Sequence, residues 1–258
     1  MKRLIQLVKN LIKWIINIPL RIRLKNIGTN SRVVYPYIIE GAKYISVGDN
    51  VRIYNNVYMQ AIKKDVDPVI KIGSNIRMWY NTQLSAVREI VIEDGCTFAA
   101  NCFISDTTHD YTDITTLAYF SKLKELNPVR IGAGTWVGRN VTIMGCKIGK
   151  HCVIGNSSFV TKDIPDYCVV VGNPAIIIKR YDMKTNQWLK TDKNGNFLYL
   201  LNSGGGVNPN YLLAFDNGLF AICNNYSINI IILFYLYSVK ILSQLSGTDK
   251  NYLYVYEY

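Results

Sequence analysis

Histidine is scarce in this sequence, and its cysteines lack the spacing of metal ligands. The 258 residues include two histidines, His109 and His151, and six cysteines with no Cys-x-x-Cys pair. A zinc site within one chain needs several such ligands at close spacing, so we expect no metal. This cysteine usage favours a reducing, cytoplasmic compartment.

The sequence contains no recognisable nucleic-acid-binding motif, and we expect no secretory signal. Its formal net charge of +11 points to an acidic partner, which is a membrane phospholipid, a phosphorylated cofactor or nucleic acid. The basic residues are scattered after the first 25 positions, so nucleic acid is the weakest of the three and we expect none. Lys9 and Lys13 interrupt the apolar run that a signal peptide requires, and no small-residue cleavage site follows.

Residues 1–26 are expected to form a basic amphipathic helix that ends near Pro19. Lys2, Lys9 and Lys13 fall on one side of a helical wheel, and leucine, isoleucine and valine side chains fall on the other. Two interpretations stay open. The helix lies in the interface of an anionic membrane, which would put the protein at the inner face of the cytoplasmic membrane, or it packs over the open end of the main domain.

Apolar residues recur at intervals of six over most of residues 27–180. Glycine often follows the apolar residue, and a small or β-branched residue often stands two positions before it. The six triplets are Ile27, Val33 and Ile39; Val47, Ile53 and Met59; Ile72, Met78 and Leu84; Ile92, Phe98 and Ile104; Ile131, Val137 and Ile143; and Ile148, Ile154 and Val160.

A period of six is neither the period of an α-helix nor the unbroken alternation of an ordinary strand. A short strand followed by a turn satisfies it, with the large aliphatic side chain inward and the small residue at the corner. Three hexamers then close a triangular coil, and stacked coils hydrogen-bond as parallel strands. A conventional sheet with accidental spacing is hard to reconcile with so many triplets. The cysteine pairs six apart, Cys96 with Cys102 and Cys146 with Cys152, are then small interior residues.

The repeat is interrupted, and the interruptions mark where function is expected. The largest break, residues 105–128, predicts an excursion from one corner of the coil, and excursions of this length are usually functional. After the β-helix, residues 181–202 are expected to form a C-terminal extension. Residues 203–258 contain an apolar stretch at 228–239, which is shorter than the ~20 residues of a membrane span, and their fold is not predicted.

The segment IGAGTWVGRNVTI at residues 131–143 is followed by VTKDIP at 160–165 and GNPA at 172–175. This arrangement resembles the hexapeptide-repeat sugar O-acetyltransferases, which include the maltose, galactoside, capsule and lipopolysaccharide O-acetyltransferases, over roughly residues 27–195. The resemblance implies a left-handed β-helix and a homotrimer with each active site in the groove between neighbouring copies. It also implies acetyl-CoA along that groove and a saccharide acceptor.

Two features depart from the pattern of this family. Many of these enzymes have a second histidine two positions before the catalytic one, where this chain has Thr107. In place of a Pro-Gly bend after Ile143, the chain has Met144 and Gly145 and one residue fewer, so that Ile148 follows after a step of five. The first departure bears on the choice of acceptor, and the second on the shape of the groove wall.

His109 is the candidate catalytic base. Acetyl transfer from a thioester to a hydroxyl needs a group that removes the hydroxyl proton, and a neutral imidazole near pH 7 suits that task. His109 lies at the start of the long insertion, and Asp106-Thr-Thr-His109 matches the place of the family's catalytic histidine. Asp106, Asp110 or a main-chain carbonyl is expected to fix its tautomer. The alternative is a loop histidine without a role, and we interpret His151 as a surface turn residue.

Three residues are candidate acceptor contacts: Asp106, Trp136 and Asn81. Trp136 precedes the inward-facing Val137, so alternation points it outward. There it can stack on a sugar or pack along pantetheine, and family resemblance places it beside the active site; packing at a trimer interface is the alternative. The oxyanion donor is expected to be a backbone N–H at a turn.

The resemblance also implies cofactor contacts near the end of the β-helix. A lysine offers a point charge for the CoA phosphates, and the family's Gly-Asn-Pro turn borders the pantetheine. Solvated surface residues are the alternative for each position. The candidate contacts are Asn156, Ser157, Thr161, Lys162, Gly172, Asn173, Pro174 and Lys179.

The sequence therefore predicts an acetyl-CoA-dependent O-acetyltransferase that acts on a hydroxyl of a saccharide, such as a precursor of a cell-surface polysaccharide. N-acetylation of an amino sugar, serine acetylation and antibiotic acetylation stay open as alternative reactions. The zinc-dependent carbonic anhydrase version of the fold is disfavoured, because it needs three histidines per site and this chain has two with unsuitable spacing. A non-catalytic β-helix scaffold is the remaining class.

Overall fold

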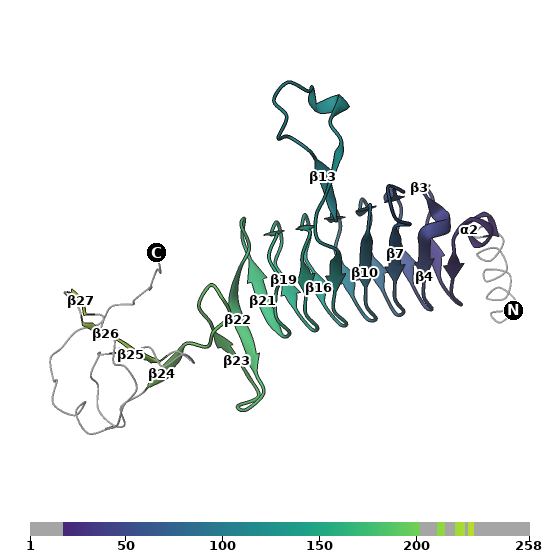
Figure 1. Ribbon diagram of the computed structural model, residues 1–258. Helices are drawn as coiled ribbons and strands as arrows, with labels where there is room; N and C mark the ends of the chain where they lie inside the picture. The colour runs from purple at the N-terminus through teal and green to yellow at the C-terminus, as the bar shows by residue number, and fades with distance from the viewer. Residues whose placement is uncertain (1–17, 202–210, 215–219, 225–226, 230–258) are drawn as a thin grey trace, which may run out of the picture. The chain divides into compact units, whose positions relative to one another are not determined.

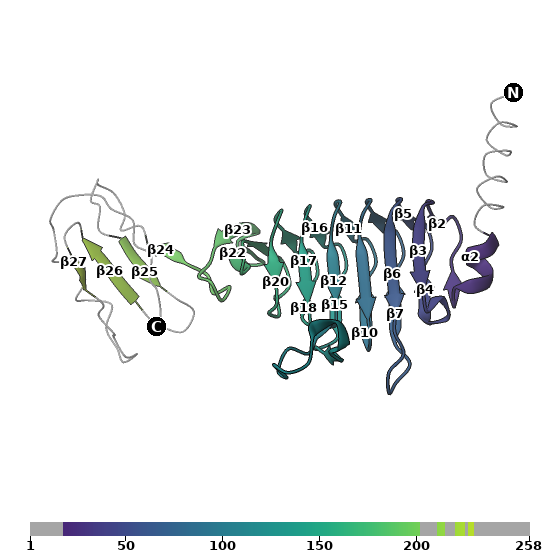
Figure 2. The same ribbon diagram turned by 90° about the horizontal axis from the view of Figure 1, so that it is seen from above.

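The computed structural model describes residues 18–201, 211–214, 220–224 and 227–229, and the chain divides into two compact units. The first unit ends at Ile178, and the second begins at Lys179. The first is a left-handed parallel β-helix, whose short strands stack in three sheets along a column (Figure 1). Each turn of the chain contributes one strand to each sheet, so that strands far apart in the sequence lie side by side (Figure 2).

We call the three sheets of the column A, B and C. Sheet A contains β1 (Asn26–Ile27), β4 (Ile45–Val47), β7 (Val69–Ile72), β10 (Glu89–Ile92), β15 (Val129–Ile131) and β18 (Lys147–Ile148). Sheet B contains β2 (Arg32–Val33), β5 (Arg52–Ile53), β8 (Arg77–Met78), β11 (Thr97–Phe98), β16 (Trp136–Val137), β19 (Val153–Ile154) and β21 (Cys168–Val171). Sheet C contains β3 (Tyr37–Glu40), β6 (Val57–Ala61), β9 (Gln83–Ala86), β12 (Phe103–Ser105), β17 (Thr142–Met144) and β20 (Phe159–Val160). A 3-10 helix, η1 (Ala42–Tyr44), lies between β3 and β4.

The large apolar residues of the six triplets stack on one another inside the column. In sheet A, Ile27 pairs with Val47 and Ile92 with Ile131 in parallel register. Every member of the triplets is 6% exposed or less. Burying a side chain of this size contributes about 1.5–3 kcal/mol, so the stacked rows form the core. The predicted β-helix and its six-residue repeat are confirmed.

Five of the cysteines belong to the same core. Burial raises the pKa of Cys96 and Cys102 to about 11 and that of Cys146 to about 12. A thiol that is so hard to ionise is a poor nucleophile and a poor metal ligand. The interpretation of the cysteine pairs as interior residues is confirmed. The buried free thiols are Cys96, Cys102, Cys146, Cys152 and Cys168.

A ladder of asparagines lines the corner between sheets B and C. Asn56, Asn81, Asn101 and Asn140 have φ angles between 58° and 64°, a left-handed conformation that asparagine adopts more readily than most residues. The side-chain amide of Asn81 donates to Oδ1 of Asn101 at 3.0 Å, and the amide of Asn101 donates to Oδ1 of Asn140 at 2.9 Å. Asn81, a candidate acceptor contact, is therefore a structural member of this corner.

Replacing Asn101 by alanine should lower the free energy of unfolding by about 2 kcal/mol. The alanine has to adopt the left-handed conformation, and two side-chain hydrogen bonds are lost. Asn101→Gly is the matched variant, because glycine adopts this conformation freely, and we expect it to lose only about 1 kcal/mol. Urea unfolding followed by circular dichroism measures both values, and equal losses would contradict a conformational contribution.

The helix α2 (Ile18–Arg23) covers the first coil of the column. Leu20 and Leu24 are buried and belong to the core cluster. Arg21 and Arg23 donate hydrogen bonds at 3.2 Å to main-chain carbonyls of the first coil. For residues 18–24, packing over the open end of the main domain is confirmed.

Pro19 is the second residue of α2, and the chain stays helical to Arg23. The end of the expected helix near Pro19 stays a prediction, because the residues before Ile18 lie outside the described part. Proline fits the first turn of a helix because the N–H that it lacks has no partner there. The predicted membrane contact rests on residues 1–17, which lie outside the described residues. Among the described residues, no helix is long and apolar enough to cross a membrane.

The second unit contains antiparallel strands. Strand β22 begins in the first unit and pairs with β23, so that Lys179 lies opposite Lys190. Of the apolar stretch at 228–239, only the first two residues lie within the described part. The strands are β22 (Ile176–Asp182), β23 (Gln187–Lys190), β24 (Tyr199–Leu201), β25 (Tyr211–Ala214), β26 (Phe220–Asn224) and β27 (Ser227–Asn229).

Candidate active site

The long interruption of the repeat forms a hairpin that projects from the corner between sheets C and A (Figure 1). We call residues 106–128 the flap. Its strands β13 (Thr107–His109) and β14 (Leu123–Glu125) pair in antiparallel register, and a 3-10 helix, η2 (Ala118–Phe120), lies between them. The chain leaves the column at the end of β12 and returns at the start of β15, so the flap is an arm attached at one corner.

Asp106 fixes the base of the flap. Its carboxylate accepts three backbone N–H groups, from Val87 at 2.7 Å, Arg88 at 2.8 Å and Glu89 at 2.6 Å. Burial raises the pKa of the Asp106 carboxyl above its ordinary value, and the three N–H donors oppose that shift. The sequence suggests that Asp106 contacts the acceptor or orients His109. The structure instead gives it 0% exposure under the flap, where the main chain occupies both carboxylate oxygens.

Further contacts hold the flap against the column. The hydroxyl of Thr107 is buried and donates to the carbonyl of Lys124 at 2.9 Å, which closes β13 on β14. The ammonium of Lys64 donates to the carbonyl of Leu123 at 3.1 Å and lies 3.3 Å from the carboxylate of Glu125. Thr107 therefore has a structural role at the position where many related enzymes have a second histidine.

His109 ends β13 with an exposed side chain. Its Nδ1 lies 3.3 Å from the hydroxyl oxygen of Ser121, near the returning strand of the flap. The Asp110 carboxylate instead accepts hydrogen bonds from the backbone N–H and the hydroxyl of Thr112. The expectation that Asp106 or Asp110 orients the imidazole is therefore wrong. With the proton on Nδ1 and shared with Ser121, the lone pair of Nε2 is available to accept a substrate proton.

A hollow of about 350 Å³ lies at the base of the flap. Thr108, which directly precedes His109, lines one part of it, and Thr161, a candidate cofactor contact, lines another. The hollow therefore connects the flap with the end of sheet C. Its lining residues are Thr108, Leu126, Asn127, Met144, Gly145 and Thr161.

Gly145 determines how closely the flap approaches the column. It has a φ of 57°, and a Cβ atom added to it would lie 2.8 Å from Cβ of Leu126. Gly145→Ala should therefore lower the free energy of unfolding by about 2 kcal/mol or more, through backbone strain and a displaced flap. Gly95→Ala is the matched control, because Gly95 has a φ of 75° but no atom closer than 3.7 Å to the added Cβ.

The control should lose about 1 kcal/mol, which is the backbone term alone. Thermal unfolding of the two variants measures the difference. Equal losses would contradict a close contact between the flap and the corner at Gly145.

Seven of the eight candidate cofactor residues gather around β20. The N–H of Phe159 in β20 donates to the carbonyl of Gly172, and the N–H of Ala175 donates to the carbonyl of Phe159, both at 2.9 Å. Lys179 belongs to the second unit. Asn156 and Ser157 precede β20, Thr161 and Lys162 follow it, and Gly172, Asn173 and Pro174 form the turn beside it.

Trp136 lies on a different side of the column from the flap. It is 54% exposed on the outer face of sheet B, so the predicted outward orientation is confirmed. In a three-sided column, sheet B is the face opposite the corner between sheets C and A. Within one chain, Trp136 therefore lies on one side of the column, and the flap that carries His109 lies on the opposite side.

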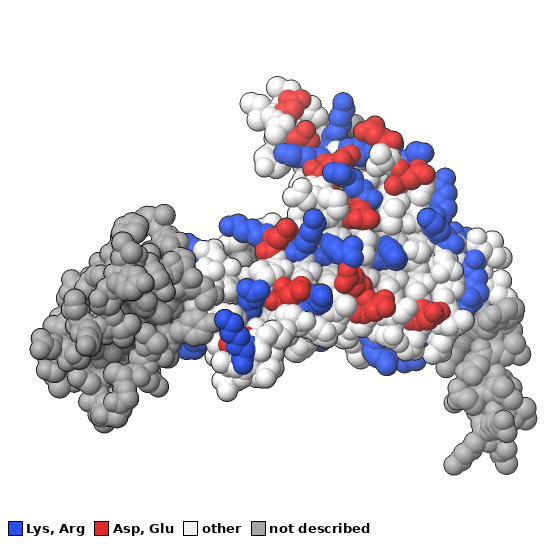
Figure 3. Space-filling model, turned by 60° about the horizontal axis from the view of Figure 1, so that its bottom comes forward, with Lys and Arg blue, Asp and Glu red and all other residues white. Residues whose placement is uncertain are grey.

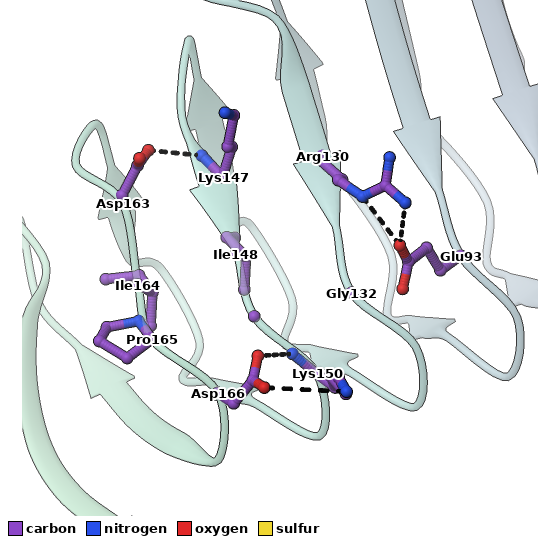
Figure 4. Close-up of a pocket in the computed structure, with 11 residues that line it drawn as sticks. Glu93, Arg130, Gly132, Lys147, Ile148, Lys150, Asp163, Ile164, Pro165 and Asp166 are labelled. Atoms are coloured by element: carbon purple, nitrogen blue, oxygen red, sulfur yellow. Dashed lines mark hydrogen bonds and ion pairs between the residues drawn. The ribbon is translucent and has the colours of Figure 1, made fainter.

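A larger hollow, of about 440 Å³, lies on the outer face of sheet A (Figure 4). Two ion pairs line it: Nε of Arg130 donates to Glu93 at 2.8 Å, and the ammonium of Lys150 lies 4.0 Å from Asp166. The flank of the column shown in Figure 3 likewise carries basic and acidic side chains next to each other. No candidate residue lines this hollow, so we assign the candidate site to the hollow at the base of the flap, which Thr108 and Thr161 line.

His151 has the role that the sequence predicts. It is exposed, has a φ of 50°, and stacks on Tyr167 with the ring centroids 5.7 Å apart. It lies at the corner between sheets A and B, which the flap does not touch. The interpretation of His151 as a surface turn residue is confirmed.

Comparison with known proteins agrees with this architecture. Residues 128–162 match the family model of the bacterial transferase hexapeptide (six repeats). A Mycobacterium tuberculosis protein named as an acetyltransferase is 40% identical over 92 residues, which cover 35% of this chain and 30% of that protein. The Escherichia coli protein WbbJ, named as an O-acetyl transferase of lipopolysaccharide biosynthesis, is 32% identical over 111 residues, which cover 40% of this chain and 57% of WbbJ. Over these residues the chain is similar to hexapeptide-repeat acetyltransferases.

A solved structure shares the fold of this hexapeptide-repeat chain. AntD, an N-acyltransferase from Bacillus cereus in complex with dTDP and 3-hydroxybutyryl-CoA, superimposes with a TM-score of 0.54 at 20% identity, over 64% of this chain and 87% of AntD. The sequence matches, by contrast, span less than two thirds of the length of either curated relative.

Three residues of the candidate site could not be predicted from the sequence. Ser121 approaches His109 only because the flap folds back on itself, and no local motif announces that pairing. Leu126 and Asn127 line the hollow from the last turn of the flap. The one signal in the sequence is the step of five between Ile143 and Ile148, which brings the shortened corner against the flap.

Proposed function

We propose that this protein transfers an acetyl group from acetyl-CoA to a hydroxyl of a saccharide, with His109 as the general base. The observation that supports this most is the position of His109 on an arm beside the hollow that leads to β20. The candidate cofactor residues gather at that strand, and the imidazole is held at Nδ1 by Ser121. The names of the M. tuberculosis and E. coli relatives agree with acetyl transfer.

The proposed reaction is a direct transfer. Nε2 of His109 takes the proton of the acceptor hydroxyl as the oxygen attacks the thioester carbonyl. A backbone N–H at a turn stabilises the resulting oxyanion. The C–S bond then breaks, the carbonyl reforms as the acetyl ester, and the imidazolium returns the proton to the sulfur, which leaves as CoA thiol. Ser121 accepts the Nδ1–H during these steps and keeps the imidazole in one tautomer.

The proposed site lies between two copies of the chain. His109 and Trp136 point away from opposite sides of one column, so they can share a substrate only if a second copy brings sheet B toward the flap. A head-to-tail contact of this kind closes into a ring when the rotation between copies is a third of a turn, and we propose such a homotrimer. In that arrangement Trp136 contributes a flat apolar surface against a sugar ring or the pantetheine.

Titration calorimetry with acetyl-CoA and a continuous assay of released CoA thiol test the proposal together. The five described core cysteines are buried, so they should add little background to a thiol reagent. We expect binding of acetyl-CoA and thiol release that depends on a hydroxyl-bearing saccharide.

Acceptors of other classes distinguish the alternative reactions. Faster thiol release with amino sugars, with serine or with an aminoglycoside antibiotic would show that this compound, and not a saccharide hydroxyl, is the preferred acceptor. The absence of any CoA binding would favour a β-helix scaffold without catalysis.

A further inference from the structure

Three arginines stack on the outer face of sheet B. Arg32 pairs with Arg52 in the register of the sheet, and Arg52 pairs with Arg77. Neighbouring strands lie about 4.8 Å apart, so the three side chains start in one line across three adjacent coils. We call Arg32, Arg52 and Arg77 the arginine row. Like charges placed side by side repel one another, so the arginine row destabilises the sheet unless a ligand or partner compensates its charge.

The arginine row has no acidic partner in the described part of the chain. The ion pairs found there engage other basic residues, such as Arg130 with Glu93 and Lys150 with Asp166. Nε of Arg32 is buried without a hydrogen-bond partner. Burial and, after it, the charge of Arg52 lower the pKa of Arg32. The positive charge of the arginine row is therefore left uncompensated, whereas Arg130 and Lys150 at the hollow on sheet A each have an acidic partner.

Aromatic side chains flank the arginine row on the same face. Tyr54 and Trp79 follow Arg52 and Arg77 by two residues, and their rings stack with centroids 4.7 Å apart and planes 9° apart. The register then continues from Arg77 to Thr97 and from Thr97 to Trp136. Sheet B thus carries the arginine row on three adjacent coils, with the stacked rings of Tyr54 and Trp79 beside it. Thr97 lies on the next coil, and the exposed Trp136 lies on the coil after that.

This sequence of surfaces fits one kind of ligand. Guanidinium groups bind phosphate and carboxylate oxygens through paired hydrogen bonds, and aromatic faces bind sugar rings. Trp136 lies two strands from Arg77, which is about 10 Å, so one molecule can contact both. A neutral sugar would use the tryptophan but would leave the arginine row without a partner.

We propose that the acceptor is an anionic saccharide, which lies along the outer face of sheet B with its phosphate or carboxylate groups on the arginine row and a sugar ring against Trp136. This inference rests on the proposed function, because it assigns the acceptor class of that same site. It gives the arginine row the role of selecting acceptors by charge, while His109 of a second copy carries the chemistry.

Binding of two matched oligosaccharides tests the proposal directly. Trigalacturonate carries one carboxylate on each sugar, and maltotriose carries none; inorganic pyrophosphate serves as the phosphate probe. We expect calorimetry to show binding of trigalacturonate and pyrophosphate that weakens as salt increases. In the double variant Arg52→Gln/Arg77→Gln this binding should weaken about tenfold or more, while the weaker binding of maltotriose stays unchanged.

The control removes the same charge from elsewhere on the column. Lys43→Gln/Lys71→Gln replaces two exposed lysines away from sheet B, and it should bind all three probes like the unsubstituted protein. Arg77→Gln alone, at an exposed position, serves as the second variant should the double variant unfold at a lower temperature. Equal affinity of the unsubstituted protein and both arginine variants for trigalacturonate and pyrophosphate would overturn the proposal.

Two other outcomes would also overturn it. Binding to phosphatidylglycerol vesicles that depends on the arginine row, without binding of trigalacturonate, would make the row a membrane contact. A change of oligomeric state in the arginine variants by analytical ultracentrifugation, again without anion binding, would make it a contact between subunits. Acetyl-CoA binding is measured on the same samples and tests the proposed function separately. If the unsubstituted protein does not bind acetyl-CoA, the transfer reaction is contradicted, but the result on anion binding still holds.

Discussion

Replacing His109 by alanine is expected to lower kcat for acetyl transfer by about 10²–10⁴-fold. The variant lacks the group that takes the hydroxyl proton, and water in an exposed groove is a much weaker base. The affinity for acetyl-CoA should change little, because the candidate cofactor residues lie around β20 and not on the flap. Steady-state kinetics with a verified acceptor, together with calorimetry for acetyl-CoA, separates the two effects.

His151→Ala is the matched control for this prediction. It removes the second histidine of the chain, which is exposed at the corner between sheets A and B and stacks on Tyr167. Its rate should equal that of the unsubstituted protein. Ser121→Ala should give an intermediate loss of about tenfold, since it removes only the partner of Nδ1. An unchanged rate in His109→Ala would show that the base has been assigned to the wrong residue.

Replacing Asp106 by alanine is expected to give the largest loss of stability, about 3 kcal/mol or more. The substitution leaves the buried N–H of Val87 and the partly buried N–H groups of Arg88 and Glu89 without their acceptor, and an unsatisfied buried donor costs about 1–3 kcal/mol. The flap should detach from the column at the same time, because Asp106 is its first residue. Urea unfolding and the rate of proteolytic cleavage within residues 106–128 measure the two consequences.

Asp113→Ala provides the comparison. The Asp113 carboxylate also accepts three hydrogen bonds, from the N–H and hydroxyl of Thr115 and from the hydroxyl of Thr116. It is exposed near the tip of the flap, where water replaces lost partners, so the free energy of unfolding should change little. Similar losses for the two aspartate variants would contradict the account of Asp106 as a buried anchor.

The column could be predicted from the sequence because its repeat is local. Each hexamer brings its own inward residue and its own corner, so rows such as Ile92 above Ile131 follow from counting in steps of six. The interior position of the cysteines followed from the same count. Pro19 was harder to interpret, because proline ends a helix in one position and begins it in another.

The contacts of the candidate site could not be predicted in this way. Ser121 meets His109 across twelve residues of flap, and Asp106 meets the main chain of the preceding coil at Val87. Such partners depend on how two segments fold against each other, which no short period encodes. The side of the column that carries Trp136 could be derived from alternation, but its separation from His109 became visible only in three dimensions.

The central claim is that one site draws His109 from one copy and Trp136 from the next, and a mixing experiment tests it most directly. His109→Ala and Trp136→Ala are purified separately, then unfolded and refolded together in equal amounts. If the site lies between copies in a ring, about a quarter of the seams combine an intact histidine with an intact tryptophan, and the activity exceeds the average of the two parent variants. If the mixture shows only that average, both residues act within one chain or not together, and the proposed site between copies is contradicted.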